Sequence, residues 1–264
     1  YAISAHGDVA VTLNFSRFLW TRPVCGYAGT LDAWEGQAHP SDDGIYRVDL
    51  VSGTSELIVS LGQMAAFQPR DGMADANHWF NHLMFNTDGT RFMFFHRWAP
   101  PGERWTTRLY TANADGSDIY LVADDDMTSH CDWRDERHVL AWARQHDTGD
   151  RFYMFTDRSD ERSVVGERLL PKDGHCTFSP DRRWVLADCY PNRSEPYRVV
   201  YLYTPAEDRR VDIARVYSPP TLTSEIRCDL HPRWNRDGTE VCFDSAHEGD
   251  RQMYVVDVSG IVAG

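Results

Sequence analysis

The sequence lacks the signals of several common classes of protein. No apolar run approaches the roughly 20 residues that a membrane-spanning helix needs, and no positively charged, apolar leader opens the chain. None of the six cysteines forms a CxxC pair, which argues against a zinc knuckle or a dithiol redox motif. A G-x-S-x-G elbow and a phosphate-binding glycine loop are also missing, so neither a serine nucleophile nor a nucleotide site is indicated.

Positive charge is scarce as well. The formal net charge is −13 and the pI is near 5.2, so the surface repels nucleic acid and acidic membranes, and we expect neither as a partner. An anionic small substrate would require arginines that create a local positive field. Most cysteines lie in strand-like patterns, and we expect free thiols in a reducing compartment, which predicts a cytoplasmic protein.

What the sequence does contain is a repeated pattern. Four segments begin with a histidine and have an aromatic residue three positions later, at 82–85, 130–133, 175–178 and 231–234. A turn aspartate follows each of them, and these aspartates are spaced about 50 residues apart: Asp88, Asp135, Asp181 and Asp237. A period of this size, built from short strands, is typical of a β-propeller.

Apolar alternation and Asp-Gly turns predict an all-β domain of four-stranded antiparallel blades covering residues 1–264. Five blade units are expected, at about 3–61, 76–124, 128–170, 173–216 and 225–264. A long insertion is expected at 16–43, and a short helical turn near 61–67. Five blades could close into a ring by themselves, but the abrupt start at Tyr1 favours the absence of N-terminal blades, and a signal peptide could have preceded them.

Residues at equal phase in successive blades lie around the propeller axis. We therefore expect His82, His130, His175 and His231 to surround one pocket. Neutral imidazoles held close together suit a divalent transition metal, and Asp229 could add an oxygen ligand. Blade repetition could also reproduce one structural histidine in each unit, and this alternative stays open.

Arginines and polar residues near the same strand ends are candidates for binding an anionic substrate, because guanidinium forks match carboxylates. Any one of these arginines could instead be a solvated surface charge. The aromatic residues could hold a sugar ring, although core packing is favoured for them. The candidates for substrate binding are Arg97, Asn81, His82, Arg227 and Tyr190, with Arg108 beside the same loop.

Two other functions are compatible with these residues. A pair of aspartates at a suitable separation would make a glycosidase, and four recur near strand ends: Asp132, Asp188, Asp229 and Asp244. A propeller that binds a protein or glycan partner through its rim, without catalysis, is the other alternative.

Several segments between about 76 and 258 resemble oligogalacturonate lyase, a polysaccharide lyase family. The similar segments are 79–96, 108–117, 129–133, 174–181 and 231–238, in the same order and at similar spacing. The generic Ser-Pro-Asp-Gly turn is shared by many propellers, whereas the placement of the histidines and of Arg108 is more specific.

The resemblance implies a seven-bladed propeller that binds manganese near its axis and cleaves short galacturonides by β-elimination. It implies that His130 is the catalytic base, that Arg108 stabilises the substrate, and that His175 and His231 bind the metal. Asp229 stands where the family has a further histidine ligand, and about Ile226 where it has a glutamine ligand.

These observations together predict a metal-assisted carbon–oxygen lyase. Its substrate would be an acidic oligosaccharide of the kind released in pectin degradation, and its cofactor a divalent metal, Mn²⁺, on His175, His231 and Asp229.

Overall fold

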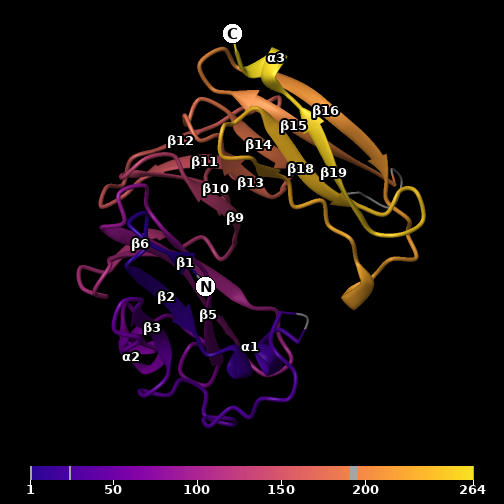
Figure 1. Cartoon of the computed structure of the whole chain (residues 1–264). Coiled ribbons are helices and arrows are strands. Elements are labelled where there is room, and N and C mark those ends of the chain that lie inside the picture. The colour runs from indigo at the N-terminus through magenta and orange to yellow at the C-terminus, as the bar shows by residue number, and fades with distance from the viewer. Residues whose placement is uncertain (1, 24, 191–195, 264) are drawn as a thin grey trace. The chain divides into compact units, whose positions relative to one another are not determined.

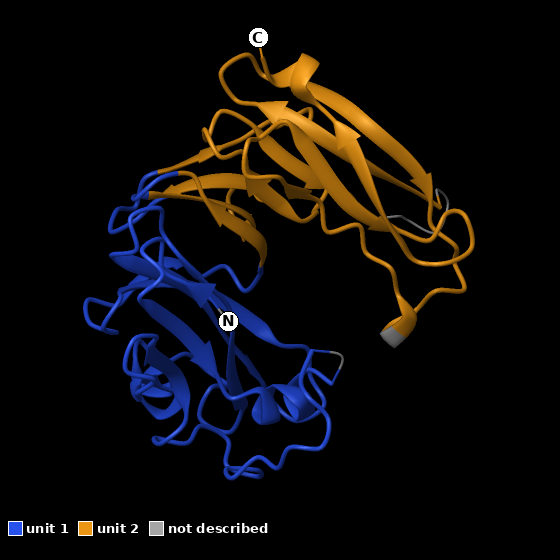
Figure 2. Cartoon of the chain, viewed as in Figure 1, with its two compact units in different colours: residues 1–128, 135–137, 156–161 blue, residues 129–134, 138–155, 162–264 orange. Residues whose placement is uncertain are grey.

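The computed structural model describes residues 2–23, 25–190 and 196–263, and their regular structure is almost entirely β (Figure 1). The chain divides into two compact units, which are described separately (Figure 2). Unit 1 contains residues 1–128, 135–137 and 156–161, and unit 2 contains residues 129–134, 138–155 and 162–264. No helix in the described residues has both the length and the apolar character needed to cross a membrane.

Five sheets follow one another along the chain, and in each of them neighbouring strands are consecutive in sequence. Unit 1 holds two sheets: β1 (Ala2–Ile3), β2 (Val9–Leu13), β3 (Gly44–Asp49) and β4 (Ser55–Ser60), then β5 (Asn77–Phe85), β6 (Arg91–Ala99), β7 (Thr106–Asn113) and β8 (Tyr120–Ala123). Neighbouring strands in both sheets pair antiparallel.

Unit 2 holds most of the third sheet and all of the last two. Their strands are β9 (Thr128–Trp133), β10 (His138–Gln145), β11 (Gly149–Thr156) and β12 (Arg162–Val164), then β13 (Cys176–Phe178), β14 (Val185–Asp188), β15 (Tyr197–Thr204) and β16 (Arg209–Tyr217), and finally β17 (Arg233–Trp234), β18 (Glu240–Ser245) and β19 (Gln252–Asp257). The last sheet has three strands among the described residues rather than the four expected of each blade.

Helices are few and short. They are α1 (Phe15–Thr21), α2 (Leu61–Ala66), η1 (Ser224–Ile226) and α3 (Ser259–Val262). The helical turn expected near 61–67 is α2, which begins with a capping box in which Ser60 and Gln63 exchange hydrogen bonds. The insertion expected at 16–43 also contains a helix that the sequence reading did not include, because Asn14 caps the first turn of α1 by accepting from the backbone N–H groups of Ser16 and Arg17.

The repeated turn aspartates have a local structural role. Asp88 accepts from the backbone N–H of Thr90 at 3.0 Å, Asp135 from that of Arg137 at 2.9 Å, and Asp181 from that of Arg183 at 3.1 Å. Each carboxylate thus closes a turn two residues ahead of itself. This geometry explains why the sequence shows an aspartate at the same phase of successive repeats.

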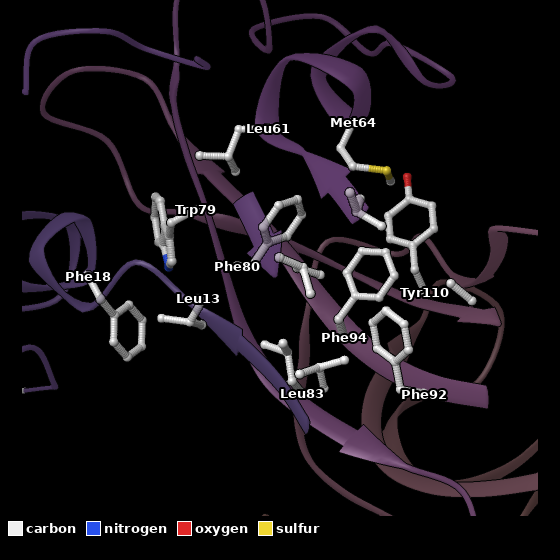
Figure 3. Packing of buried hydrophobic residues seen from close by; sticks show 14 of the residues in the cluster. Leu13, Phe18, Leu61, Met64, Trp79, Phe80, Leu83, Phe92, Phe94 and Tyr110 are labelled. Carbon is white, nitrogen blue, oxygen red and sulfur yellow. The ribbon is translucent and has the colours of Figure 1, made fainter. Parts of the chain in front are cut away.

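In unit 1, the core lies between the first two sheets and is rich in aromatic rings (Figure 3). Phe94 of β6 stacks on Tyr110 of β7 with ring centroids 5.5 Å apart, and Trp79 and Phe80 of β5 are also buried. Burial of each ring contributes roughly 1.5–3 kcal/mol. Trp79 and Phe80 therefore pack in the core, which is the role that the sequence favoured for the aromatic residues near this strand.

A pair of fully buried histidines lies beside this core. The Nδ1 of His78 contacts the Nε2 of His96 at 2.8 Å, and the Nε2 of His78 donates to the carbonyl oxygen of Met73 at 2.8 Å. Burial lowers the pKa of His78 to about 4, so this pair is uncharged at neutral pH.

In unit 2, a separate core joins the last two sheets. Leu186, Val200 and Leu202 of one sheet pack with Val241 and Phe243 of the next. β13 and β17 are the first strands of these two sheets, and a histidine precedes each of them.

Candidate functional site

Three of the four repeated histidines come together within unit 2. His130 lies on β9, His175 directly before β13, and His231 two residues before β17. The ring centroids of His130 and His175 are 4.2 Å apart, and those of His175 and His231 are 3.7 Å apart. Equal phase in successive blades therefore gives a row of imidazoles in contact, which we call the histidine cluster.

The backbone around His175 is shaped to bring a carboxylate under it. A Cβ added at Gly174 would collide with the carbonyl oxygen of Asp188, so only glycine permits this close approach. The backbone N–H of His175 donates to Oδ1 of Asp188 at 2.7 Å, and its ring Nδ1 contacts Oδ2 at 2.9 Å. Asp188 thus holds both the main chain and the ring of His175.

His231 has an unusual backbone conformation, with φ of 40°. This left-handed region is uncommon for residues other than glycine and typically costs on the order of 1 kcal/mol or more. Partial desolvation and the neighbouring imidazole of His175 hold the pKa of His231 below its ordinary value. The ring is therefore neutral at neutral pH, the state in which imidazole binds a metal.

A second carboxylate fixes His130. Its Nδ1 contacts Oδ1 of Asp173 at 2.9 Å, and the hydroxyl of Ser129 lies 3.1 Å from the same nitrogen. A carboxylate that accepts from Nδ1–H selects the tautomer in which Nε2 carries the lone pair. His130 and His175 are thus both oriented with a basic Nε2 directed away from their aspartates.

Tyr190 lies between these two basic nitrogens. Its hydroxyl oxygen is 3.2 Å from Nε2 of His130 and 3.1 Å from Nε2 of His175. Burial, with nearby Asp229 and Asp188, raises the pKa of Tyr190 well above its ordinary value, so the hydroxyl keeps its proton at neutral pH.

Asp229 brings negative charge to the same place but is itself paired. Its Oδ1 accepts from Nη1 of Arg198 at 2.6 Å, and its Oδ2 from Nη2 of Arg227 at 2.5 Å. Burial raises the pKa of Asp229, but the bonds and ion pairs with the two arginines outweigh burial and hold the pKa below its usual value. Arg198 is buried, whereas the side chain of Arg227 is about half exposed.

The donor atoms of His175, Asp229 and His231 could hold a metal ion. One ligand atom from each lies within 4.8 Å of those of the other two. Two imidazoles and one carboxylate match the preferences of a divalent first-row metal, so the residues fit such an ion. The two arginines on Asp229 oppose its binding electrostatically, and the exposed Ile226, at the place of the family's glutamine, offers no ligand atom.

The predicted site residues of unit 1 have local partners there. The Arg108 guanidinium is buried and donates to both carboxylate oxygens of Asp124, at 2.5 and 2.9 Å, and to the carbonyl oxygen of Gln68 at 2.8 Å. Asp124 therefore occupies the fork that the resemblance assigns to a substrate. The catalytic role of Arg108 remains a prediction.

The other three candidates in unit 1 are also largely enclosed. The Nε of Arg97 donates to the hydroxyl of Thr107 at 3.0 Å, and its residue is buried. Asn81 is buried on β5, and the ring of His82 stacks on Phe95 at a centroid distance of 4.7 Å. Their roles as substrate-binding residues stay predictions.

The aspartates considered for a glycosidase have other partners. Asp132 is buried and accepts from the backbone N–H of Phe178 at 2.7 Å, and Asp244 pairs with Arg251 at 3.0 Å. Asp188 and Asp229 bind His175 and the two arginines, as described above. Each of the four aspartates therefore has partners within the protein, and the glycosidase alternative stays a prediction.

Sequence reasoning missed Asp173, the partner of His130, and the role of Arg198. It noted Asp188 only as a possible glycosidase acid. Asp173 lies two residues before His175, but nothing in the sequence indicates that it contacts a histidine of the preceding blade. Arg198 is one of several arginines in strand patterns and carries no distinguishing signal.

Comparison with solved structures defines the class of protein. An oligogalacturonate lyase from Vibrio parahaemolyticus superposes with a TM-score of 0.63 at 15% identity, covering 97% of this chain and 65% of that one. An oligogalacturonate lyase in complex with manganese gives 0.56 at 16% identity, over 82% of this chain and 57% of that one. TolB from Acinetobacter baumannii gives 0.58 at 13% identity, over 98% and 51%. The chain has the β-propeller fold, as predicted.

These likenesses are at the level of fold. The chain spans less than two thirds of the length of each of the three solved chains. No protein-family model matches the sequence, and no curated protein matches it significantly.

Proposed function

We propose that the protein is a metal-assisted uronide lyase that cleaves short acidic oligosaccharides by β-elimination. The observation that carries the proposal is the histidine cluster, in which two oriented imidazoles and a third in ring contact meet beside Asp229. The fold-level likeness to oligogalacturonate lyases supports the same reaction class.

The reaction requires removal of the proton on C5 of a uronic acid, which is weakly acidic while the adjacent carboxylate keeps its charge. His175, Asp229 and His231 would hold a divalent cation, which when bound neutralises that carboxylate as a Lewis acid. The buried arginine Arg198 keeps Asp229 ionised and in place for this purpose.

His130 would act as the base. Because Asp173 accepts from Nδ1–H, the lone pair of Nε2 takes the C5 proton and Asp173 stabilises the imidazolium that results. The electrons of the C5–H bond then form the C4–C5 double bond, and the C4–O bond breaks with its electron pair on the leaving oxygen. The product carries a 4,5-unsaturated uronate.

Tyr190 and Arg227 would contact the substrate. The Tyr190 hydroxyl touches the proposed base and a proposed metal ligand, so a substrate that reaches His130 must displace or bond it. The half-exposed guanidinium of Arg227 is the cation best placed to attract a uronate carboxylate toward the cluster.

The test is an ultraviolet assay for the unsaturated product with oligogalacturonides and other uronide oligomers in the presence of Mn²⁺. We expect His130→Ala to abolish the signal and keep Mn²⁺ binding, and His175→Ala to lose both. His247→Ala is the matched control, because His247 contacts Ser245 and Tyr254 in the same unit and lies outside the cluster. Bound metal without any unsaturated product across the panel would instead indicate a non-catalytic propeller.

A further inference from the structure

We propose that two copies of the chain pair through the outer strand of the last sheet, antiparallel and in one register around a two-fold axis. This sheet has the order β17–β18–β19, so β19 is its outer strand (Figure 1), whereas each of the other four sheets has a fourth strand. After β19 the chain forms α3, and Ile261 and Val262 pack against the core of the last two sheets. The described residues therefore leave the outer edge of β19 without a neighbouring strand.

That edge presents backbone groups at alternate residues. Val258 donates its N–H to the carbonyl oxygen of Thr239 at 2.8 Å, and residues that bond to a given neighbour alternate along an antiparallel pair. Every second residue of β19 therefore bonds to β18, and the others direct their N–H and C=O groups outward: Met253, Val255 and Asp257. Among the described residues, none forms a hydrogen bond with these outward groups. Such an edge is a template for a further strand.

The side chains of the same residues lie on an exposed face. Met253 and Val255 are apolar and yet 65% and 61% exposed. Alternate side chains share one face of a strand, so Arg251, directly before the strand, and Asp257, at its end, continue this row, and both are exposed. The strand contains no lysine or proline, which are residues that commonly keep an edge from pairing.

The row is complementary to itself. In the antiparallel register that centres on Tyr254, Met253 lies opposite the partner's Val255. The same register places Arg251 opposite the partner's Asp257. Two-fold symmetry repeats both pairs, so two apolar pairs lie between two pairs of opposite charge.

Charge selects both the occupant and the register. Cross-strand pairs of opposite charge stabilise a sheet, whereas like charges directly opposite destabilise it. A shift of two residues in one direction places Asp257 opposite the partner's Met253, and a shift in the other direction places Arg251 opposite the partner's Val255. Only the register centred on Tyr254 pairs each charge with its opposite and each apolar side chain with another.

The interface is small, so we expect a weak dimer. β19 has six residues, and an interface of this length is below the standard size, which corresponds to a dissociation constant on the order of 10 µM. The net charge of −13 on each copy opposes association at low salt, but charges more than roughly 8 Å apart are largely screened at physiological ionic strength. The pairing needs neither a metal nor lyase activity.

The test is sedimentation equilibrium of the chain at about 1–200 µM and physiological ionic strength. The mass should rise from that of one 30.3 kDa chain toward twice that value. Arg251→Asp and Asp257→Arg should each weaken dimerisation at least about tenfold, because each places like charges opposite one another at both ends. An equimolar mixture of these two variants should dimerise again, and so should the variant that carries both substitutions.

Arg233→Asp is the matched control for Arg251→Asp. It changes the net charge by the same amount and removes the other arginine paired with Asp244, but it lies on β17, two strands from the edge. It should dimerise as the unmodified chain does. Asp257→Arg lowers the net negative charge, so general repulsion alone would strengthen association in that variant, whereas the proposed register weakens it.

Three results would overturn the proposal: the mass of a single chain at every concentration, undiminished dimerisation in the two single variants, or a mixture of them that stays monomeric. Recovery in the mixture requires both variants to be folded, so it separates a lost contact from a disrupted sheet. Val255→Lys places a charge beside the two-fold axis and should also abolish dimerisation, which provides an independent check.

Discussion

The position of Asp188 leads to a prediction that separates metal binding from folding. This carboxylate is almost fully buried and accepts from both the backbone N–H and the ring Nδ1 of His175, at 2.7 and 2.9 Å. In Asp188→Asn, the amide oxygen can keep the backbone bond. The amide N–H₂ then faces Nδ1, and His175 changes to the tautomer in which Nε2 carries the proton.

The magnitude follows from that change. Nε2 is the nitrogen directed into the cluster, so its lone pair is no longer offered to a metal. Loss of a carboxylate behind a ligating histidine typically reduces metal affinity about 10–100-fold. Replacing charge-assisted hydrogen bonds by neutral ones costs about 1–2 kcal/mol of unfolding free energy. We therefore expect Asp188→Asn to bind Mn²⁺ about 30-fold more weakly and to be mildly destabilised.

The assay is calorimetric titration with Mn²⁺ together with urea unfolding. Asp132→Asn is the matched control, since Asp132 is also a buried aspartate that accepts a backbone N–H and a side-chain donor, from Phe178 and Thr177. It should be destabilised by a similar amount and bind Mn²⁺ as the unmodified protein does. Wild-type affinity in Asp188→Asn, or an equal loss in Asp132→Asn, would refute the role given to Asp188.

Three more predictions concern charges elsewhere in the structure. Arg227→Gln should strengthen Mn²⁺ binding about tenfold, since a unit charge about 5 Å from a dication contributes roughly 1.5 kcal/mol in a water-like dielectric. Titration of Arg233→Gln is the control, because that substitution removes a cation paired with Asp244 instead. Unchanged Mn²⁺ affinity in Arg227→Gln would count against the metal site. Burial lowers the pKa of His78 from 6.5 to about 4, so between these pH values the unfolded chain binds a proton that the folded chain does not, and the free energy of unfolding falls by up to roughly 3 kcal/mol as pH drops from 6.5 to 4. Urea unfolding at pH 7 and 4.5 should show a smaller loss of stability in His78→Asn than in the unmodified protein. An equal loss would contradict the assignment. Arg108→Gln should lower the free energy of unfolding by about 2 kcal/mol, because it loses the hydrogen bonds to Asp124. Arg104→Gln, at an exposed position, should not lower it. Equal stability of the two variants would show that the contacts of the Arg108 guanidinium do not stabilise the fold.

The strands could be predicted well because their signals are local. Short strands occupy each of the five predicted blade units, and Asp88, Asp135 and Asp181 mark successive blades because each closes its own turn. The histidines were found for the same reason, since equal phase in a repeat places residues at equivalent positions. Three of them meet in unit 2.

The partners of those histidines were less predictable because they come from distant segments. Asp173 reaches His130 across 43 residues and Asp188 reaches His175 across 13, and both contacts depend on how one blade lies against its neighbour or how one strand folds back on the next. The partner of Arg108 shows the same limit. Asp124 follows the next strand of the blade, and its bidentate contact with the guanidinium arises only when β7 and β8 pair.

Asp229 shows how a buried carboxylate changes its surroundings. An imidazole at that place would be neutral, whereas a buried carboxylate requires compensation, and Arg198 and Arg227 supply it. Under the proposed function, those cations would weaken metal binding and attract an anionic substrate at the same time. Because Arg198 is buried and Arg227 half exposed, the two effects can be separated: Arg198 stabilises the ionised carboxylate, and Arg227 can leave it for a uronate. Substrate that recruits Arg227 thereby frees one oxygen of Asp229 for the metal, so metal and substrate should bind more tightly together than either does alone.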